Sequence, residues 1–178
     1  MRHVTLVGSR AAGGESGLSD WDFLVDTDRF DELAPQLPRL IEPLEPLSWL
    51  WDPLSDDATY FMFIVPGPTK VDLVFDRPPD PQPLWTVTAA TLPLVDAHFW
   101  DFSLWLASKR EKGNDELLAY LVPVLGRHIL EPLGVDEAPV SIAHAVELYL
   151  PARERAEEQL RVRVPRALGD EVRPVLLR

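Results

Sequence analysis

Residues 7–28 of the chain read VGSRAAGGESGLSDWDFLVDTD. A run of small residues opens with Gly8 and Ser9, and after a spacer Asp20 and Asp22 stand one residue apart before an apolar Phe-Leu-Val. Successive side chains of a strand point to opposite faces, so a strand here directs both carboxylates to the same face. Two like charges roughly 6–7 Å apart repel each other unless a cation neutralises them. The stretch therefore predicts a polar site on the surface of a β-sheet.

A third aspartate, Asp72, interrupts the apolar run KVDLVF, where strand propensity disfavours it. If its strand lies beside the strand of Asp20 and Asp22, the three carboxylates converge. Mg²⁺ prefers such oxygen ligands, and a set of this kind can hold two metal ions roughly 4 Å apart for phosphoryl or nucleotidyl displacement. Each aspartate taken alone also has a structural explanation. Asp20 can belong to a turn, and Asp72 can form an ion pair with Lys70 or Arg77.

The turn at Gly8 and Ser9 suits a phosphate, because small residues let backbone amides approach an anion and a hydroxyl adds a donor. Other motifs do not fit the stretch. A Walker A loop needs a lysine where Gly14 stands, and an apolar run interrupts the acidic residues that a calcium EF-hand loop would require. No histidine pair has metal-ligand spacing, and no Gly-x-Ser-x-Gly motif is present.

The periodicity of the chain predicts an α+β fold: a mixed sheet flanked by helices over residues 1–90, then a helical bundle over residues 91–178. A Pro-Gly-Pro turn predicts a hairpin between the last two strands, and the segment PPDPQP has the composition of a rigid linker. Pro38 and Pro151 should each interrupt a helix. The predicted strands cover residues 3–7, 21–25, 47–51, 60–65 and 70–75, and the predicted helices cover 30–41, 94–112, 115–130 and 140–163.

The chain has 178 residues, no cysteine and a formal net charge of −12. Disulfides, Fe–S clusters and cysteine nucleophiles are therefore excluded. The charge repels polyanions, so nucleic acid is disfavoured as a partner; it either attracts a cationic small molecule or only favours solubility. No apolar run is long enough for a membrane span and no secretory leader is recognisable, so we expect no membrane partner and a cytoplasmic location.

The order of the parts, Gly-Ser, a spacer, Asp-Trp-Asp, Phe-Leu-Val and a later Val-Asp-Leu-Val strand, resembles the DNA polymerase β-like nucleotidyltransferase superfamily. The likeness is greatest to its small bacterial branch, which includes the antibiotic nucleotidyltransferases that modify aminoglycosides and lincosamides. It covers roughly the first half of the chain. The resemblance implies a nucleotidyltransferase core over residues 1–90 and a helical, acceptor-binding domain over residues 91–178, in a monomer or homodimer.

The resemblance also implies transfer of a nucleoside monophosphate from a nucleoside triphosphate, such as ATP, to a hydroxyl of a small acceptor. Members often have a basic residue where Ala12 stands, and Arg10 can compensate for it. Lys109, near the end of a helix, either contacts the triphosphate or complements the helix dipole. The implied catalytic residues and Mg²⁺ ligands are Asp20, Asp22 and Asp72, and the implied nucleotide contacts are Gly8, Ser9, Arg10 and Lys109.

Two alternatives remain open. The chain can be an antitoxin-type minimal nucleotidyltransferase that binds or modifies a protein partner, although the helical second half argues against it. It can also be a binding module that keeps the fold without turnover. The three aspartates argue against that second alternative, and Ala12 argues weakly for it.

Overall fold

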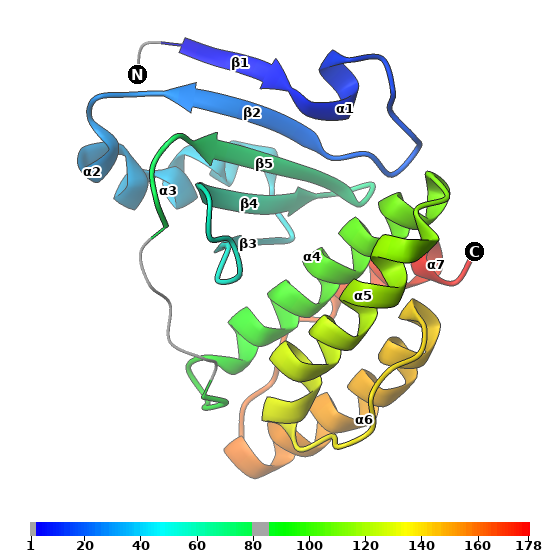
Figure 1. Ribbon diagram of the computed structural model, residues 1–178. Helices are drawn as coiled ribbons and strands as arrows, with labels where there is room; N and C mark the ends of the chain where they lie inside the picture. The colour runs from blue at the N-terminus through cyan, green and yellow to red at the C-terminus, as the bar shows by residue number, and fades with distance from the viewer. Residues whose placement is uncertain (1–2, 80–85) are drawn as a thin grey trace. The chain divides into compact units, whose positions relative to one another are not determined.

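The computed structural model describes residues 3–79 and 86–178, and it shows an α+β protein with a five-stranded mixed sheet and a C-terminal helical region (Figure 1). The chain divides into two compact units, Met1–Gln82 and Pro83–Arg178. The sequence places this boundary near residue 90. Most of the PPDPQP segment lies outside the described residues, so its rigidity stays a prediction.

The first unit is built on a sheet with the strand order β1-β2-β5-β4-β3. Strands β2 and β5 run parallel, whereas the other neighbouring pairs run antiparallel. The predicted hairpin is confirmed, because Val65 of β4 lies opposite Thr69 of β5 across the Pro-Gly-Pro turn. The strands lie within one residue of their predicted bounds and are β1 (His3–Val7), β2 (Trp21–Asp26), β3 (Ser48–Trp51), β4 (Thr59–Val65) and β5 (Thr69–Phe75).

One face of the sheet carries the apolar core of this unit. Helices α2 (Phe30–Leu33) and α3 (Leu37–Ile41) supply the residues that pack against the strands. A 3₁₀ turn, Ala34–Gln36, separates the two helices, so the predicted interruption falls just before Pro38. Pro38 then lies in the first turn of α3, where its missing N–H removes no helical hydrogen bond. The buried cluster consists of Val25, Leu37, Ile41, Phe61, Phe63 and Phe75.

The second unit is helical, and its helices are α4 (Leu92–Glu111), α5 (Asp115–Leu125), α6 (Ile142–Leu160) and α7 (Ala167–Leu176). The predicted helix over residues 115–130 is α5 followed by a π-helical turn, Gly126–Leu130. No helix in the described parts of the chain is long and apolar enough to cross a membrane.

The predicted interruption at Pro151 is wrong, because α6 continues through this residue. Proline removes one backbone donor, which leaves the carbonyl four residues earlier, that of Glu147, without its helical partner. Both Pro151 and Glu147 lie on the exposed side of α6, so water can reach that carbonyl. Helix α7 was not predicted, although Leu168, Val172 and Leu176, which it buries, recur every four residues.

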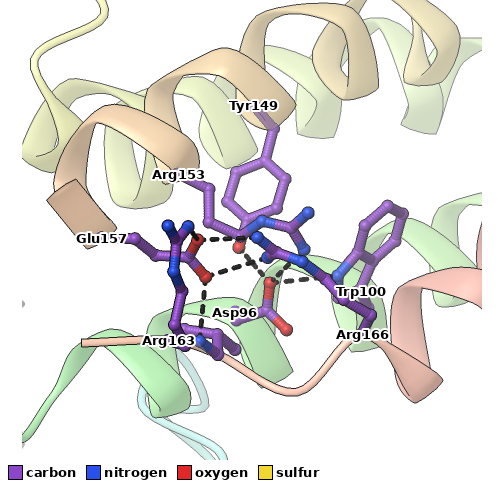
Figure 2. Close-up of polar contacts among 8 residues, drawn as sticks. Asp96, Trp100, Tyr149, Arg153, Glu157, Arg163 and Arg166 are labelled. Atoms are coloured by element: carbon purple, nitrogen blue, oxygen red, sulfur yellow. Dashed lines mark hydrogen bonds and ion pairs between the residues drawn. The ribbon is translucent and has the colours of Figure 1, made fainter.

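A buried carboxylate joins α4 to α6 in the second unit (Figure 2). Asp96, which is 2 % exposed, accepts hydrogen bonds from Tyr149 Oη at 2.5 Å, Arg153 Nη1 at 3.1 Å and Trp100 Nε1 at 3.2 Å. Burial raises the pKa of the Asp96 carboxyl, and the bond from Tyr149 and the charge of Arg153 oppose that rise. The buried Arg153 guanidinium therefore depends on Asp96 for its counter-charge.

A second carboxylate, Glu157 of α6, holds the segment that leads into α7 (Figure 2). It accepts hydrogen bonds from the backbone N–H of Val164 at 2.9 Å and from Arg166 Nη2 at 2.6 Å. Arg163 Nη1 lies 3.2 Å from Glu157 Oε2. Burial works to raise the pKa of Glu157, but the bonds from Arg166 and Val164 outweigh it and lower this pKa below its ordinary value. Glu157 thus fixes the chain's turn after α6.

Candidate metal centre

The three aspartates singled out by the sequence lie together in the first unit. Asp22 of β2 is the register partner of Asp72 on the parallel neighbour β5, and Asp20 comes immediately before β2. One carboxylate oxygen from each residue lies within 4.8 Å of the others. Asp20 and Asp72 are buried, each 7 % exposed, and Asp22 is half-buried. The predicted convergence is confirmed, and the role of the three residues as metal ligands stays a prediction.

The face of the sheet that carries these carboxylates is opposite the apolar core. Side chains alternate along a strand, and Val71, Leu73 and Phe75 of β5 belong to the core cluster or pack against it. Lys70 and Asp72 therefore point away from that core. This alternation explains how an apolar strand accommodates an aspartate.

The backbone at Gly8 is pressed against Asp22. Val7, at the end of β1, is the register partner of Asp22, and the four-residue helix α1 (Gly8–Ala11) follows directly. Gly8 has a φ of +68°, and a Cβ atom at this position would lie 2.2 Å from Asp22 Oδ2. The left-handed conformation favours glycine, and a Cβ at this position would have to displace the Asp22 side chain. The predicted phosphate turn and the carboxylate cluster are thus direct neighbours.

Arg10 of α1 secures the segment that carries Asp20. Its Nε donates to the carbonyl oxygens of Ser19 at 3.0 Å and Asp20 at 3.2 Å, and its Nη2 donates to Ser19 O at 2.7 Å. The guanidinium also stacks 4.4 Å from the centre of the Trp21 ring. The sequence predicts a nucleotide contact for Arg10, which stays a prediction. In the structure its hydrogen bonds tie α1 to the aspartate-bearing segment.

A buried lysine lies within the acidic cluster. Lys70 is 4 % exposed and forms an ion pair with Asp72, two residues later on the same face of β5. This is one of the two ion pairs considered for Asp72 from the sequence. The other is not formed, because Arg77 lies instead 3.3 Å from Asp31 and over the ring of Phe30. The cluster therefore carries a cation of its own.

Sequence reasoning missed two further polar groups beside the cluster, Asp52 and Tyr60. Asp52 follows β3, and its backbone N–H donates to Tyr60 O at 3.0 Å. Burial raises the pKa of the Asp52 carboxyl, a hydrogen bond from the Leu54 N–H and the charge of Lys70 oppose this, and the charge of Asp72 adds to it. Burial also raises the pKa of the Tyr60 hydroxyl.

The sequence contains a signal for Asp52, because it stands one residue beyond Trp51, which packs on the core face. Alternation along β3 therefore directs Asp52 to the face of the carboxylate cluster. Asp52 begins the segment DPLSDD, whose composition indicates a turn, so its alignment with the strand before it was not predicted.

Lys109, which the sequence assigns to the nucleotide, belongs to the second unit. It lies in the last turn of α4, and its ammonium is 4.7 Å from the centre of the Trp105 ring. Cations at this end of a helix complement the helix dipole. A contact between Lys109 and a triphosphate stays a prediction.

The chemistry of the cluster suits a hard divalent cation. Its donor atoms are carboxylate oxygens, the chain contains no cysteine, and carboxylate oxygens favour Mg²⁺, Ca²⁺ or Mn²⁺ over softer metals. A Cβ at position 8 would displace the Asp22 carboxylate, so the glycine leaves room for this carboxylate in the cluster. Among residues 3–79 and 86–178, Asp20, Asp22 and Asp72 form a group that could hold a metal ion.

No family model, curated protein or solved structure matches the chain. The interpretation of the site therefore depends on its own geometry and chemistry.

Proposed function

We propose that the protein is a Mg²⁺-dependent nucleotidyltransferase that transfers a nucleoside monophosphate from a nucleoside triphosphate to a hydroxyl of a small acceptor. The observation that carries the proposal is the cluster of Asp20, Asp22 and Asp72 beside the tight turn at Gly8. Asp20 and Asp22 lie on either side of Trp21, the first residue of β2, and Asp72 lies on the parallel neighbour β5. This arrangement also supports a nucleotidyltransferase-type sheet.

The residues of the first unit have distinct roles in this proposal. Asp20, Asp22 and Asp72 would bind Mg²⁺, which supplies charge neutralisation for the triphosphate and for the attacking oxygen. Gly8 provides close backbone approach, and Arg10 keeps the Asp20 segment in place. The fit of the metal is supported by the all-oxygen donor set and by the convergence of the three carboxylates.

The proposed reaction is an in-line displacement at phosphorus. The acceptor hydroxyl oxygen forms a bond to the α-phosphorus while the bond from that phosphorus to the bridging oxygen breaks, and pyrophosphate leaves with the electron pair. The hydroxyl proton passes to a general base or to water. The net charge of −12 favours a cationic acceptor, such as an aminoglycoside-like antibiotic.

The test is a release assay for pyrophosphate with ATP, CTP, GTP or UTP, Mg²⁺ and a panel of hydroxylated antibiotics. We expect release with at least one pair of nucleotide and acceptor. The variants Asp20→Asn, Asp22→Asn and Asp72→Asn should each be slower by more than about a hundredfold, because each loses a metal ligand.

Asp26→Asn is the matched control, since Asp26 is an exposed carboxylate at the end of the same strand. It should keep the wild-type rate. The same background rate in the wild type and in all three cluster variants, with every acceptor, would refute the proposed activity. In that case a binding module without turnover becomes the better interpretation.

A further inference from the structure

Lys70 is an unusual residue to find inside a candidate cation site. Its side chain is 2 % exposed, and its ammonium pairs with Asp72, which is itself one of the three clustered carboxylates. On the neighbouring strand β4 it lies opposite Ile64, which is fully buried. A lysine in such surroundings stays charged only if carboxylates compensate the loss of water around it.

The charge of the cluster depends directly on Lys70. Three carboxylates together with one ammonium leave two negative charges, which one divalent cation neutralises. Without Lys70, the same carboxylates would repel one another more strongly and attract a cation more strongly. A cation bound to Asp72 would also lie close to the ammonium, and in a partly buried site that repulsion is screened much less than in water.

Asp52 places a further carboxylate on the same face of the sheet, beyond the three of the cluster. Its carboxyl lies within electrostatic reach of both Lys70 and Asp72. The charge of Lys70 opposes the rise in the Asp52 pKa that burial causes, so Asp52 belongs to the electrostatic surroundings of this lysine.

We propose that Lys70 is the resident counter-ion of the acidic cluster: it stabilises the fold when no metal is bound and weakens the binding of a divalent cation in the absence of nucleotide. This inference rests on the proposed function for its metal site. It makes Lys70 a positioning residue that acts through Asp72 and sets the affinity of the site. A triphosphate, which brings negative charge of its own, would then be needed for tight cation binding.

The test is a titration with Mn²⁺ alone, without nucleotide, followed by electron paramagnetic resonance of the free ion. Lys70→Met and Lys70→Gln remove the charge, and both should bind Mn²⁺ more tightly than the wild type by at least about tenfold. Lys70→Arg keeps the charge and should bind like the wild type. Lys112→Met removes an exposed lysine of the second unit and controls for the change in net charge.

Thermal unfolding of the same variants provides the second measurement. Both neutral variants should melt at a lower temperature than the wild type without metal, and saturating Mn²⁺ should raise their Tm by more than it raises the wild-type Tm. Equal or weaker Mn²⁺ binding by the neutral variants would overturn the inference. It would also be overturned if both variants stayed unfolded at saturating Mn²⁺, because a divalent cation should replace the missing charge.

These outcomes are separable from those of the transfer assay. Tighter Mn²⁺ binding by Lys70→Met, combined with no transfer from any nucleotide, would support the role of Lys70 and refute the proposed activity. Unchanged Mn²⁺ binding by the neutral variants, combined with normal transfer by the wild type, would refute the role of Lys70 alone.

Discussion

Asp22 and Asp72 stand directly opposite each other on the parallel strands β2 and β5. With Asp20 they bring three carboxylate oxygens within 4.8 Å of one another, and two of the three residues are buried. Like charges in directly opposed positions destabilise a sheet. The fold therefore concentrates negative charge at this point, and the ion pair of Lys70 with Asp72 offsets part of it.

Asp22→Asn should stabilise the metal-free protein while it removes the response to metal. Loss of one of the clustered charges relieves repulsion, and we expect a gain of about 1 kcal/mol in the free energy of unfolding. Mg²⁺ should raise the Tm of the wild type but not that of the variant. Denaturant and thermal unfolding with and without Mg²⁺ measure both effects. Asp26→Asn, on the same strand, should still respond to Mg²⁺; an equal Mg²⁺ response of Asp22→Asn would exclude Asp22 as a ligand.

Gly8→Ala and Gly13→Ala form a matched pair. Both glycines have positive φ, +68° and +70°, but only at Gly8 would a Cβ meet another atom, Asp22 Oδ2 at 2.2 Å, whereas Gly13 has open space around it. Gly13→Ala should cost only the strain of the left-handed conformation, about 1–2 kcal/mol. Gly8→Ala should cost more and should also weaken Mn²⁺ binding, because it displaces the Asp22 carboxylate. Similar effects of the two substitutions on Mn²⁺ affinity would contradict the contact.

Arg10→Met should weaken metal binding although Arg10 touches none of the three carboxylate groups in the contacts described. The substitution removes the hydrogen bonds that hold the carbonyl groups of Ser19 and Asp20. Outer contacts of this kind change metal affinity by about 10- to 100-fold. Mn²⁺ titration measures the loss, and Arg39→Met, at an exposed position of α3, serves as the control. If Mn²⁺ affinity is unchanged in Arg10→Met, the hydrogen bonds of Arg10 do not position Asp20.

Asp96→Asn should strongly destabilise the helical unit. It leaves the guanidinium of Arg153, which is 5 % exposed, without its counter-charge. Breaking a buried ion pair from one side costs about 3–5 kcal/mol. Tyr149→Phe, which removes one hydrogen bond to the same carboxylate, should cost about 1–3 kcal/mol. Urea unfolding measures both values, and a smaller loss for Asp96→Asn than for Tyr149→Phe would contradict the dependence of Arg153 on Asp96.

Protonation of the Glu157 carboxylate should make the protein less stable in acid. Its pKa is lowered in the folded state from an ordinary value of 4.5, chiefly by Arg166 and Val164 acting against burial. The unfolded state therefore takes up the proton first, so this stabilisation is complete above the unfolded pKa and is lost as the pH falls through the folded pKa. Urea unfolding of the wild type and Glu157→Gln across this range should give curves that converge in acid. Parallel curves would exclude Glu157 as the titrating group.

The sequence alone determined the elements that follow local rules. Alternation and turn chemistry located the strands to within one residue, and the aspartates in two of these strands predicted a carboxylate cluster on the condition that the strands are neighbours. Local rules were not sufficient at Pro151, because the cost of a proline depends on whether the carbonyl that it leaves unpaired reaches water. They also missed α7, a short helix whose buried stripe becomes stable only through packing.

Only the tertiary structure decided which charges meet. The pairing of β2 with β5 is a non-local choice, and it is this register that places Asp72 beside Asp22. The same fold gives Arg10 a role in holding the Asp20 segment, brings Asp52 near the cluster and places the ammonium of Lys70 against Asp72. A sequence specifies the types of charged groups in a chain, but their interaction energies depend on distance and on exclusion from water, which exist only once the sheet has formed.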